Sequence, residues 1–100
     1  MRRLAGLSAI VLVAVSPAFA GNPMRGEALA KRWCSTCHVV APDQKMARTD
    51  APTFRSIGRR PGFKPRVLAY WLLAPHPPMP DFSLTRDQAD DLASYIETLK

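Results

Sequence analysis

The stretch Trp33-Cys34-Ser35-Thr36-Cys37-His38-Val39 contains both cysteines of the chain, and a histidine directly follows the second one. A disulfide between Cys34 and Cys37 would close a very small loop, which constrains the unfolded chain least. A redox pair of the thioredoxin type needs a strand–helix setting, and no such setting is visible. A zinc site needs three or four nitrogen or sulfur ligands, and the second histidine, His76, is far away in a proline run.

The spacing C-x-x-C-H is instead typical of covalent attachment of a c-type haem. Two thiols one tight turn apart can each form a thioether with one haem vinyl group. The adjacent histidine is then held under the ring with a nitrogen directed at the iron. Haem would also supply the apolar core and the cross-link that a domain of this size needs. We therefore expect one haem c bound covalently through Cys34 and Cys37, with His38 as an iron ligand.

Residues 1–20 have the features of a secretory signal peptide. Arg2 and Arg3 form a charged start, residues 4–15 form an apolar run, and Ala18-Phe19-Ala20 is a small-x-small cleavage site. Cleavage after Ala20 would leave residues 21–100 as a single domain. Arg2 and Arg3 are the only charged residues of the leader, so its removal would lower the formal net charge from +6 to +4.

No second apolar stretch approaches the roughly 20 residues that span a bilayer. We expect a periplasmic protein whose mature form has no membrane span. Nine prolines remain in the mature chain. They divide it into short segments and leave little room for a core made of protein side chains alone.

The first half of the mature chain predicts one helix followed by a long loop. Asn22 can cap a helix that starts with Pro23, where a missing N–H costs nothing, and this helix should run into Cys34. Proline and glycine punctuate residues 39–65, so we expect a loop there, with only a short turn near residues 53–57.

The second half predicts two helices joined by a proline-rich segment. Pro65 can start a helix over residues 66–74, and its apolar residues nearly encircle it, so we expect it to be well buried. Residues 76–80 should be extended, because residues before proline are displaced from the helical region. Thr85 and Gln88 form a capping box at the start of the last helix. No alternating strand pattern is visible, so the expected class is all-α.

Residues 22–100 resemble the class I c-type cytochromes, the small monohaem type of the bacterial periplasm with His/Met-ligated iron. The resemblance implies the cytochrome c fold, in which three main helices and loops wrap around one covalently bound haem. It also implies that the first and last helices cross closely at Gly26, with Leu92 and Tyr95 as partners. The matching pieces are Cys34-Ser-Thr-Cys-His38, Asp50-Ala-Pro-Thr-Phe54, Pro77-Pro-Met-Pro80 and Asp91-Leu-Ala-Ser-Tyr95-Ile.

The resemblance implies that Met79 is the second iron ligand. Prolines on both sides fix its backbone, as a ligand loop requires. The alternative use of a methionine is to fill the core, for which Met24 and Met46 are better candidates. A thioether favours ferrous iron and raises the reduction potential. It also closes the sixth coordination position, which suits electron transfer and opposes oxygen chemistry.

Further haem contacts follow from the resemblance and from the needs of the cofactor. The other ring N–H of His38 should donate to the carbonyl of Pro52, while a simple turn proline stays the alternative. His76 is either a substitute iron ligand, at high pH or after loss of Met79, or a solvated or propionate-side residue. Trp71 is either a haem contact or a core residue. Haem propionates need donors, for which the candidates are Arg59, Arg60, Tyr70 and Trp71.

Charge is unevenly distributed along the mature chain, with basic residues in its first and middle parts and acidic residues in its last twenty positions. This is either an ordinary solvated surface or a positive ring near the haem edge that steers an acidic redox partner. Nucleic acid is a poor partner for an exported chain with no groove-reading motif.

The expected function is non-enzymatic electron transfer. A diffusible monomer would carry one electron from a donor such as a periplasmic reductase or dehydrogenase to an acceptor such as an oxidase. Two alternatives stay open. One is a haem c subunit of a periplasmic dehydrogenase or oxidoreductase complex, and the other is a haem sensor with an open sixth position.

Overall fold

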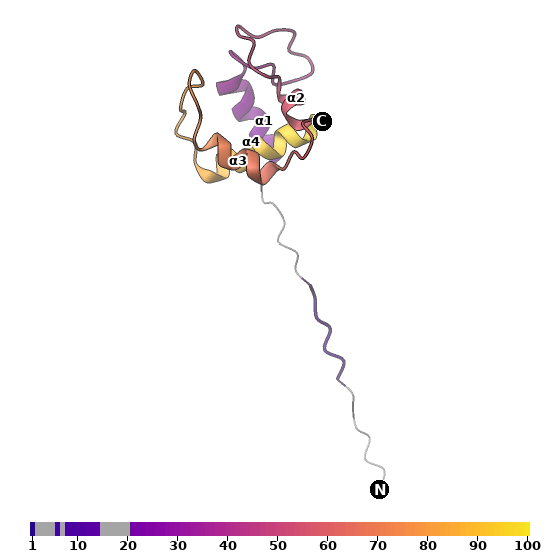
Figure 1. Cartoon of the computed structure of the whole chain (residues 1–100). Helices are drawn as coiled ribbons and strands as arrows, with labels where there is room; N and C mark the ends of the chain where they lie inside the picture. The colour runs from indigo at the N-terminus through magenta and orange to yellow at the C-terminus, as the bar shows by residue number, and fades with distance from the viewer. Residues whose placement is uncertain (2–5, 7, 15–20) are drawn as a thin grey trace.

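The computed structural model describes residues 1, 6, 8–14 and 21–100 (Figure 1), and within them the secondary structure is helical, without strands. The all-α expectation is confirmed. None of the helices in these ranges is long and apolar enough to cross a membrane. The expected cleavage site at Ala18–Ala20 and the arginines at positions 2 and 3 lie outside the described residues. The elements are α1 (Pro23–Leu29), the π-helix η1 (Ala30–Cys34), α2 (Phe54–Gly58), α3 (Pro65–Leu72) and α4 (Arg86–Thr98).

Helix α1 begins where its capping residues predict. The side chain of Asn22 accepts hydrogen bonds from the backbone N–H groups of Met24 (3.0 Å) and Arg25 (3.1 Å), and Pro23 occupies the first turn. The helix then widens into η1, which ends at Cys34. The expected run from Pro23 to Cys34 is confirmed. The π-helical turn was not predicted, and such turns often occur at functional sites.

Helix α4 begins with the expected capping box. The N–H of Gln88 donates to Thr85 Oγ1 at 3.1 Å, and the N–H of Thr85 donates to Gln88 Oε1 at 3.0 Å. Two backbone N–H groups that the helix itself cannot satisfy are thereby paired.

Helices α1 and α4 cross at Gly26, as expected. A Cβ atom at this position would overlap the carbonyl oxygen of Asp91 and would lie 2.8 Å from Tyr95 Cβ. Only glycine therefore permits this close crossing. Tyr95 is a partner as expected, but the nearest backbone belongs to Asp91 and not to Leu92.

Asp91 also joins the two helices through its side chain, which is buried. Its carboxylate accepts the backbone N–H of Asn22 at 2.7 Å and the Nε–H of Arg25 at 3.1 Å. The first turn of α1 is therefore tied to the middle of α4 by a charge-assisted hydrogen bond.

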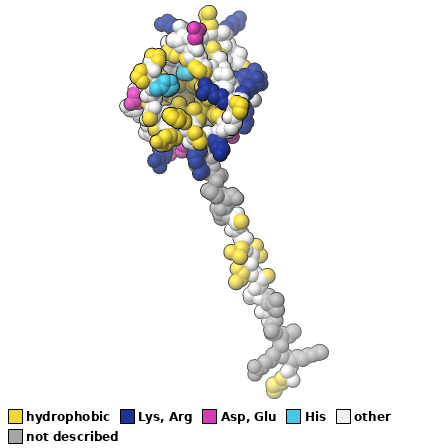
Figure 2. All heavy atoms as spheres, viewed as in Figure 1, with side chains coloured by type: hydrophobic (Ala, Val, Ile, Leu, Met, Phe, Trp, Pro, Cys, Tyr) yellow, Lys and Arg dark blue, Asp and Glu magenta, His cyan; other side chains and the backbone are white. Residues whose placement is uncertain are grey.

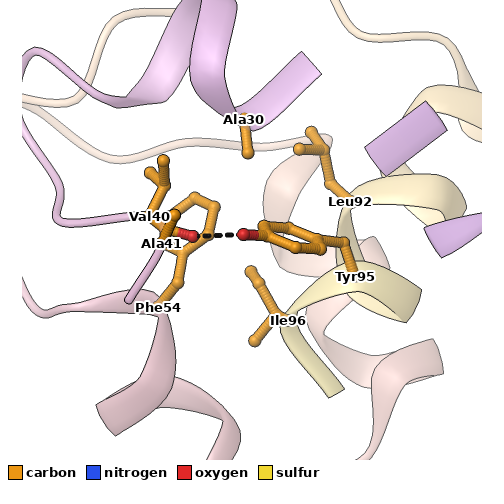
Figure 3. Packing of buried hydrophobic residues seen from close by; sticks show 7 residues of the cluster. All are labelled: Ala30, Val40, Ala41, Phe54, Leu92, Tyr95 and Ile96. Carbon is orange, nitrogen blue, oxygen red and sulfur yellow. Dashed lines mark hydrogen bonds between the residues drawn. The ribbon is translucent and has the colours of Figure 1, made fainter. Parts of the chain in front are cut away.

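The main core joins α4 to η1, α2 and the loop between them (Figure 3). It contains the buried side chains of Ala30, Val40, Ala41, Phe54, Leu92, Tyr95 and Ile96. The hydroxyl of Tyr95 donates to the carbonyl of Val40 at 2.6 Å. This bond fastens the loop after the cysteine motif to the last helix.

Helix α3 packs on α4 through one face only, so the expectation that it is well buried is wrong. Ala69 is buried against α4, whereas Val67, Tyr70 and Trp71 are 50%, 71% and 63% exposed. Positions i, i+3 and i+4 share one side of a helix, and in α3 this side faces away from α4. Apolar residues around a helix therefore did not indicate how many of its faces have protein partners.

The segment after α3 is a turn and not extended chain. The N–H of Met79 donates to the carbonyl of His76 at 2.9 Å, and the Pro77–Pro78 peptide bond is cis. The peptide bond before a proline can be cis as well as trans, and the cis form is found in tight turns. Met24 and Met46, the methionines suggested for the core, are 80% and 79% exposed, so that suggestion is wrong.

Candidate haem-binding site

The cysteine motif forms a single tight turn at the end of η1. The N–H groups of Cys37 and His38 both donate to the carbonyl of Cys34, at 3.2 and 2.9 Å. Both cysteines are free, half-buried thiols. The two sulfur groups and the imidazole therefore start from one turn of backbone, and the disulfide interpretation has no support in this geometry.

Burial, together with a smaller contribution from the neighbouring Cys37, raises the pKa of the Cys34 thiol to about 11. A redox-active cysteine of the thioredoxin type has a lowered pKa, because the thiolate is the attacking species. Cys34 is protonated at neutral pH and lacks this property. No group of three or more His, Cys, Asp or Glu side chains within residues 21–100 could hold a metal ion by itself, which gives the zinc interpretation no support either.

The ring of His38 is held in one orientation by the loop. Its Nδ1 lies 2.6 Å from the carbonyl oxygen of Pro52, and its ring centroid is 5.3 Å from that of Phe54. A carbonyl oxygen can only accept, so Nδ1 carries the proton and the lone pair of the neutral ring is on Nε2. The expected hydrogen bond is present, and it leaves Nε2 available as a ligand atom.

The turn that carries Met79 is connected to the cysteine motif through aromatic side chains. Phe82, three residues after Met79, stacks on Trp33, with ring centroids 5.9 Å apart and an angle of 5° between the planes. Trp33 directly precedes Cys34. Two segments that are more than forty positions apart in the sequence are thus neighbours in space.

Sequence reasoning missed two polar side chains that hold the motif, Gln44 and Thr49. The side-chain amide of Gln44 and the hydroxyl of Thr49 donate to backbone carbonyls of residues 35–38. Bonds from a loop side chain to a distant backbone leave no spacing pattern in the sequence, so no signal could have identified them.

Cytochrome c-552 of Bradyrhizobium diazoefficiens is 48% identical to this chain over 99 residues, in an alignment that covers 97% of this chain and 95% of the relative. The chain belongs to the class I c-type cytochromes. No family model matches the sequence, and no solved structure matches it. The fold and the covalent haem c that the motifs implied are thereby confirmed.

The residues present in this cytochrome fit a covalently bound haem. The donor set consists of two thiols from one turn, an imidazole whose Nδ1 is already paired, and a thioether in a turn next to the motif. In Figure 2, histidine and hydrophobic side chains border a hollow on one face of the globular part. This chemistry matches the needs of haem iron and of an apolar macrocycle.

The candidate propionate donors of the cytochrome lie apart from the cysteine motif in sequence and on different elements. Arg59 and Arg60 follow α2 and are exposed, and Tyr70 and Trp71 lie on the exposed side of α3, edge to face at 6.3 Å. These four side chains form none of the protein hydrogen bonds or ion pairs found within residues 21–100. The alternative that Trp71 is a core residue is wrong, because its side chain is 63% exposed. His76 is exposed, at the start of the Met79 turn.

Proposed function

We propose that this cytochrome is an exported electron carrier, that thioethers from Cys34 and Cys37 hold its haem, and that His38 and Met79 ligate the iron. Haem c supplies an iron centre that changes between the ferrous and ferric states. The observation that carries the proposal is the orientation of His38, whose Nδ1–H is bound to Pro52 at 2.6 Å. The free Nε2 then has the lone pair and the fixed direction that an iron ligand needs.

The bond to Pro52 does more than orient the ring. A carbonyl that accepts the second N–H of a ligating histidine fixes the tautomer and increases the basicity of the ligand. Pro52 has no N–H of its own, so its position does not depend on a backbone bond donated from its nitrogen.

Met79 would supply the second iron ligand from a short, proline-bounded turn. Its own N–H is bound to the carbonyl of His76 at 2.9 Å, and its side chain is half-buried. Met24 and Met46 are far more exposed, at 80% and 79%, which makes them poor alternatives. A soft thioether favours the ferrous state and leaves no open position for a substrate or for dioxygen. The proposed ligand set therefore suits an electron carrier and not an enzyme.

The basic surface supports docking to acidic redox proteins. Figure 2 shows several Lys and Arg side chains beside the hollow, with few acidic side chains on the same face. Opposite charges on two partners increase the rate of encounter, and salt weakens this effect. The donor would be a reductase or dehydrogenase, and the acceptor an oxidase. The relative is named as a cytochrome and not as a part of a complex, which favours a free carrier over a dehydrogenase subunit.

A periplasmic location rests on the leader sequence, with cleavage after Ala20, and on the family of the relative. Haem attachment to the two thiols would then follow export. Mass spectrometry of the purified protein tests both points at once, because the mature chain starts at Gly21 and carries the added mass of one haem.

The absorption spectrum of the ferric protein tests the ligand set. Methionine sulfur on ferric haem gives a weak charge-transfer band in the far red. We expect this band in the wild type and its loss in Met79→Ala. A wild-type protein that has covalent haem but lacks the band would refute ligation by Met79 and would favour the sensor alternative.

A further inference from the structure

The backbone of the cysteine motif is held by the loop segment 44–49, which supplies none of the proposed iron ligands. Four consecutive carbonyls, those of residues 35–38, come directly after the π-helical turn. Backbone carbonyls outside regular secondary structure lack a helix or sheet partner and need one elsewhere. In this cytochrome each of the four accepts a hydrogen bond from the segment 44–49.

Gln44 supplies two of these bonds. Its Nε2 lies 2.9 Å from the carbonyl oxygen of Ser35 and 3.0 Å from that of His38. The backbone N–H of Arg48 donates to Thr36 at 2.8 Å, and the hydroxyl of Thr49 donates to Cys37 at 2.8 Å.

The amide of Gln44 is satisfied at both ends. Its Oε1 accepts the N–H of Val40 at 2.9 Å, and its Nε2 is also 3.1 Å from the carbonyl of Met46. The N–H of Val40 can only donate, and the carbonyls can only accept, so the partners fix which end of the amide is nitrogen. Neither a carboxylate nor an apolar side chain of similar length can replace this pattern.

His38 is consequently held at two points. Its ring is bound to Pro52, and its backbone carbonyl is bound to Gln44. The first contact fixes rotation of the ring, and the second fixes the backbone from which the ring extends. A group held from both sides has little freedom to tilt.

We infer that Gln44 is a positioning residue for the iron ligand, and that its amide, assisted by Thr49, sets the direction of the His38 imidazole and hence the electronic state of the haem. The inference rests on the proposed ligand role of His38. It gives Gln44 a functional part beyond stability, because ligand orientation and hydrogen bonding tune a haem.

The test compares Gln44→Met with Gln88→Met in the holoprotein. Methionine matches glutamine in length and adds no charge, so a change in potential cannot arise from a new charge. Gln88 closes the capping box of α4 and has no contact with residues 34–38 among its hydrogen bonds. Both variants lose hydrogen bonds, and only Gln44→Met loses those of the motif.

We expect both variants to unfold at a lower temperature than the wild type. Only Gln44→Met should also change the reduction potential and the spread of the haem methyl shifts in the NMR spectrum of the ferric protein, which report the orientation of the axial ligands. Unchanged potential and methyl shifts in Gln44→Met, together with a lower melting temperature, would overturn the inference and leave Gln44 a purely structural role.

Thr49 provides a milder second test in case Gln44→Met does not yield holoprotein. Thr49→Val removes the hydroxyl that donates to the Cys37 carbonyl and keeps nearly the same side-chain shape. Thr49→Ser keeps the hydroxyl. We expect a change in the methyl shifts in the first variant and recovery in the second. An unchanged spectrum in Thr49→Val would overturn the inference. A wild-type protein without covalent haem would instead refute the proposed function, so the two failures are distinguishable.

Discussion

Replacing Tyr95 with phenylalanine removes one hydroxyl from the main core and leaves the ring in place. That hydroxyl donates to the carbonyl of Val40 at 2.6 Å, and Val40 is only 1% exposed. No other donor reaches this carbonyl among the hydrogen bonds of residues 21–100. The substitution therefore leaves a buried acceptor without a partner.

The expected cost follows from this geometry. An unpaired buried polar group costs about 1–3 kcal/mol. For a domain of this size, each kcal/mol lowers the melting temperature by roughly 4–8 °C. We therefore expect Tyr95→Phe to melt at least about 4 °C below the wild type, measured on the holoprotein by far-ultraviolet circular dichroism.

The difference between the two proteins should also depend on pH. Burial raises the pKa of Tyr95 above its ordinary value of 10.0, and the charge of Glu27 acts in the same direction. A group with a raised pKa contributes its stability fully below the pKa of the unfolded state, and this contribution is lost as the pH rises through the folded pKa. The gap between wild type and Tyr95→Phe should thus be constant near neutral pH and become smaller above about pH 10.

Ser83→Ala is the control for loss of an exposed hydroxyl, since Ser83 is exposed and its hydroxyl forms none of the hydrogen bonds found within residues 21–100. Surface changes of this kind usually remain within about 0.5 kcal/mol. Equal melting temperatures for Tyr95→Phe and Ser83→Ala would refute the importance of the Val40 bond.

Other predictions concern the haem, the ligand and the helix crossing. The double variant Cys34→Ala with Cys37→Ala should lose haem staining on denaturing gels and most of its helical signal. Folding costs roughly 1–2 kcal/mol of backbone entropy per residue, and this variant has no covalent haem core to offset that cost. Persistent staining would contradict covalent attachment. Met79→Ala should keep its haem, have a lower reduction potential and bind carbon monoxide, and a variant unchanged in both properties would exclude Met79 as the ligand. Gly26→Ala should destabilise the holoprotein by about 1–3 kcal/mol in chemical denaturation, because a Cβ there overlaps the Asp91 carbonyl, whereas a neutral result would mean that α1 and α4 can separate at little cost.

Features decided by neighbouring residues were predictable from the sequence. The cap at Asn22, the capping box of Thr85 and Gln88, and the turn of the cysteine motif each depend on groups a few positions apart. The bond between His38 and Pro52 spans fourteen positions. It was expected only because the family resemblance supplied the partner.

Features decided by distant contacts were not predictable from the residue pattern alone. The apolar pattern of α3 is compatible with burial on every side, yet only the side that includes Ala69 meets α4. Met24 and Met46 are exposed although methionine is a common core residue. The roles of Gln44 and Thr49 depend on where the loop returns to the motif, and loop side chains show no periodicity that reveals this.

Val40 joins the stability of the fold to the geometry of the site. Its N–H is bound to Gln44, which holds the backbone of His38, and its carbonyl is bound to Tyr95 in α4. The backbone of Val40 and the side chains of Gln44 and Tyr95 thus connect the cysteine motif to the last helix. Because α4 also meets α1 at Gly26 and α3 at Ala69, one helix is the common support of α1, α3 and the cysteine motif. A rigid support of this kind suits a carrier that must change oxidation state with little change in structure.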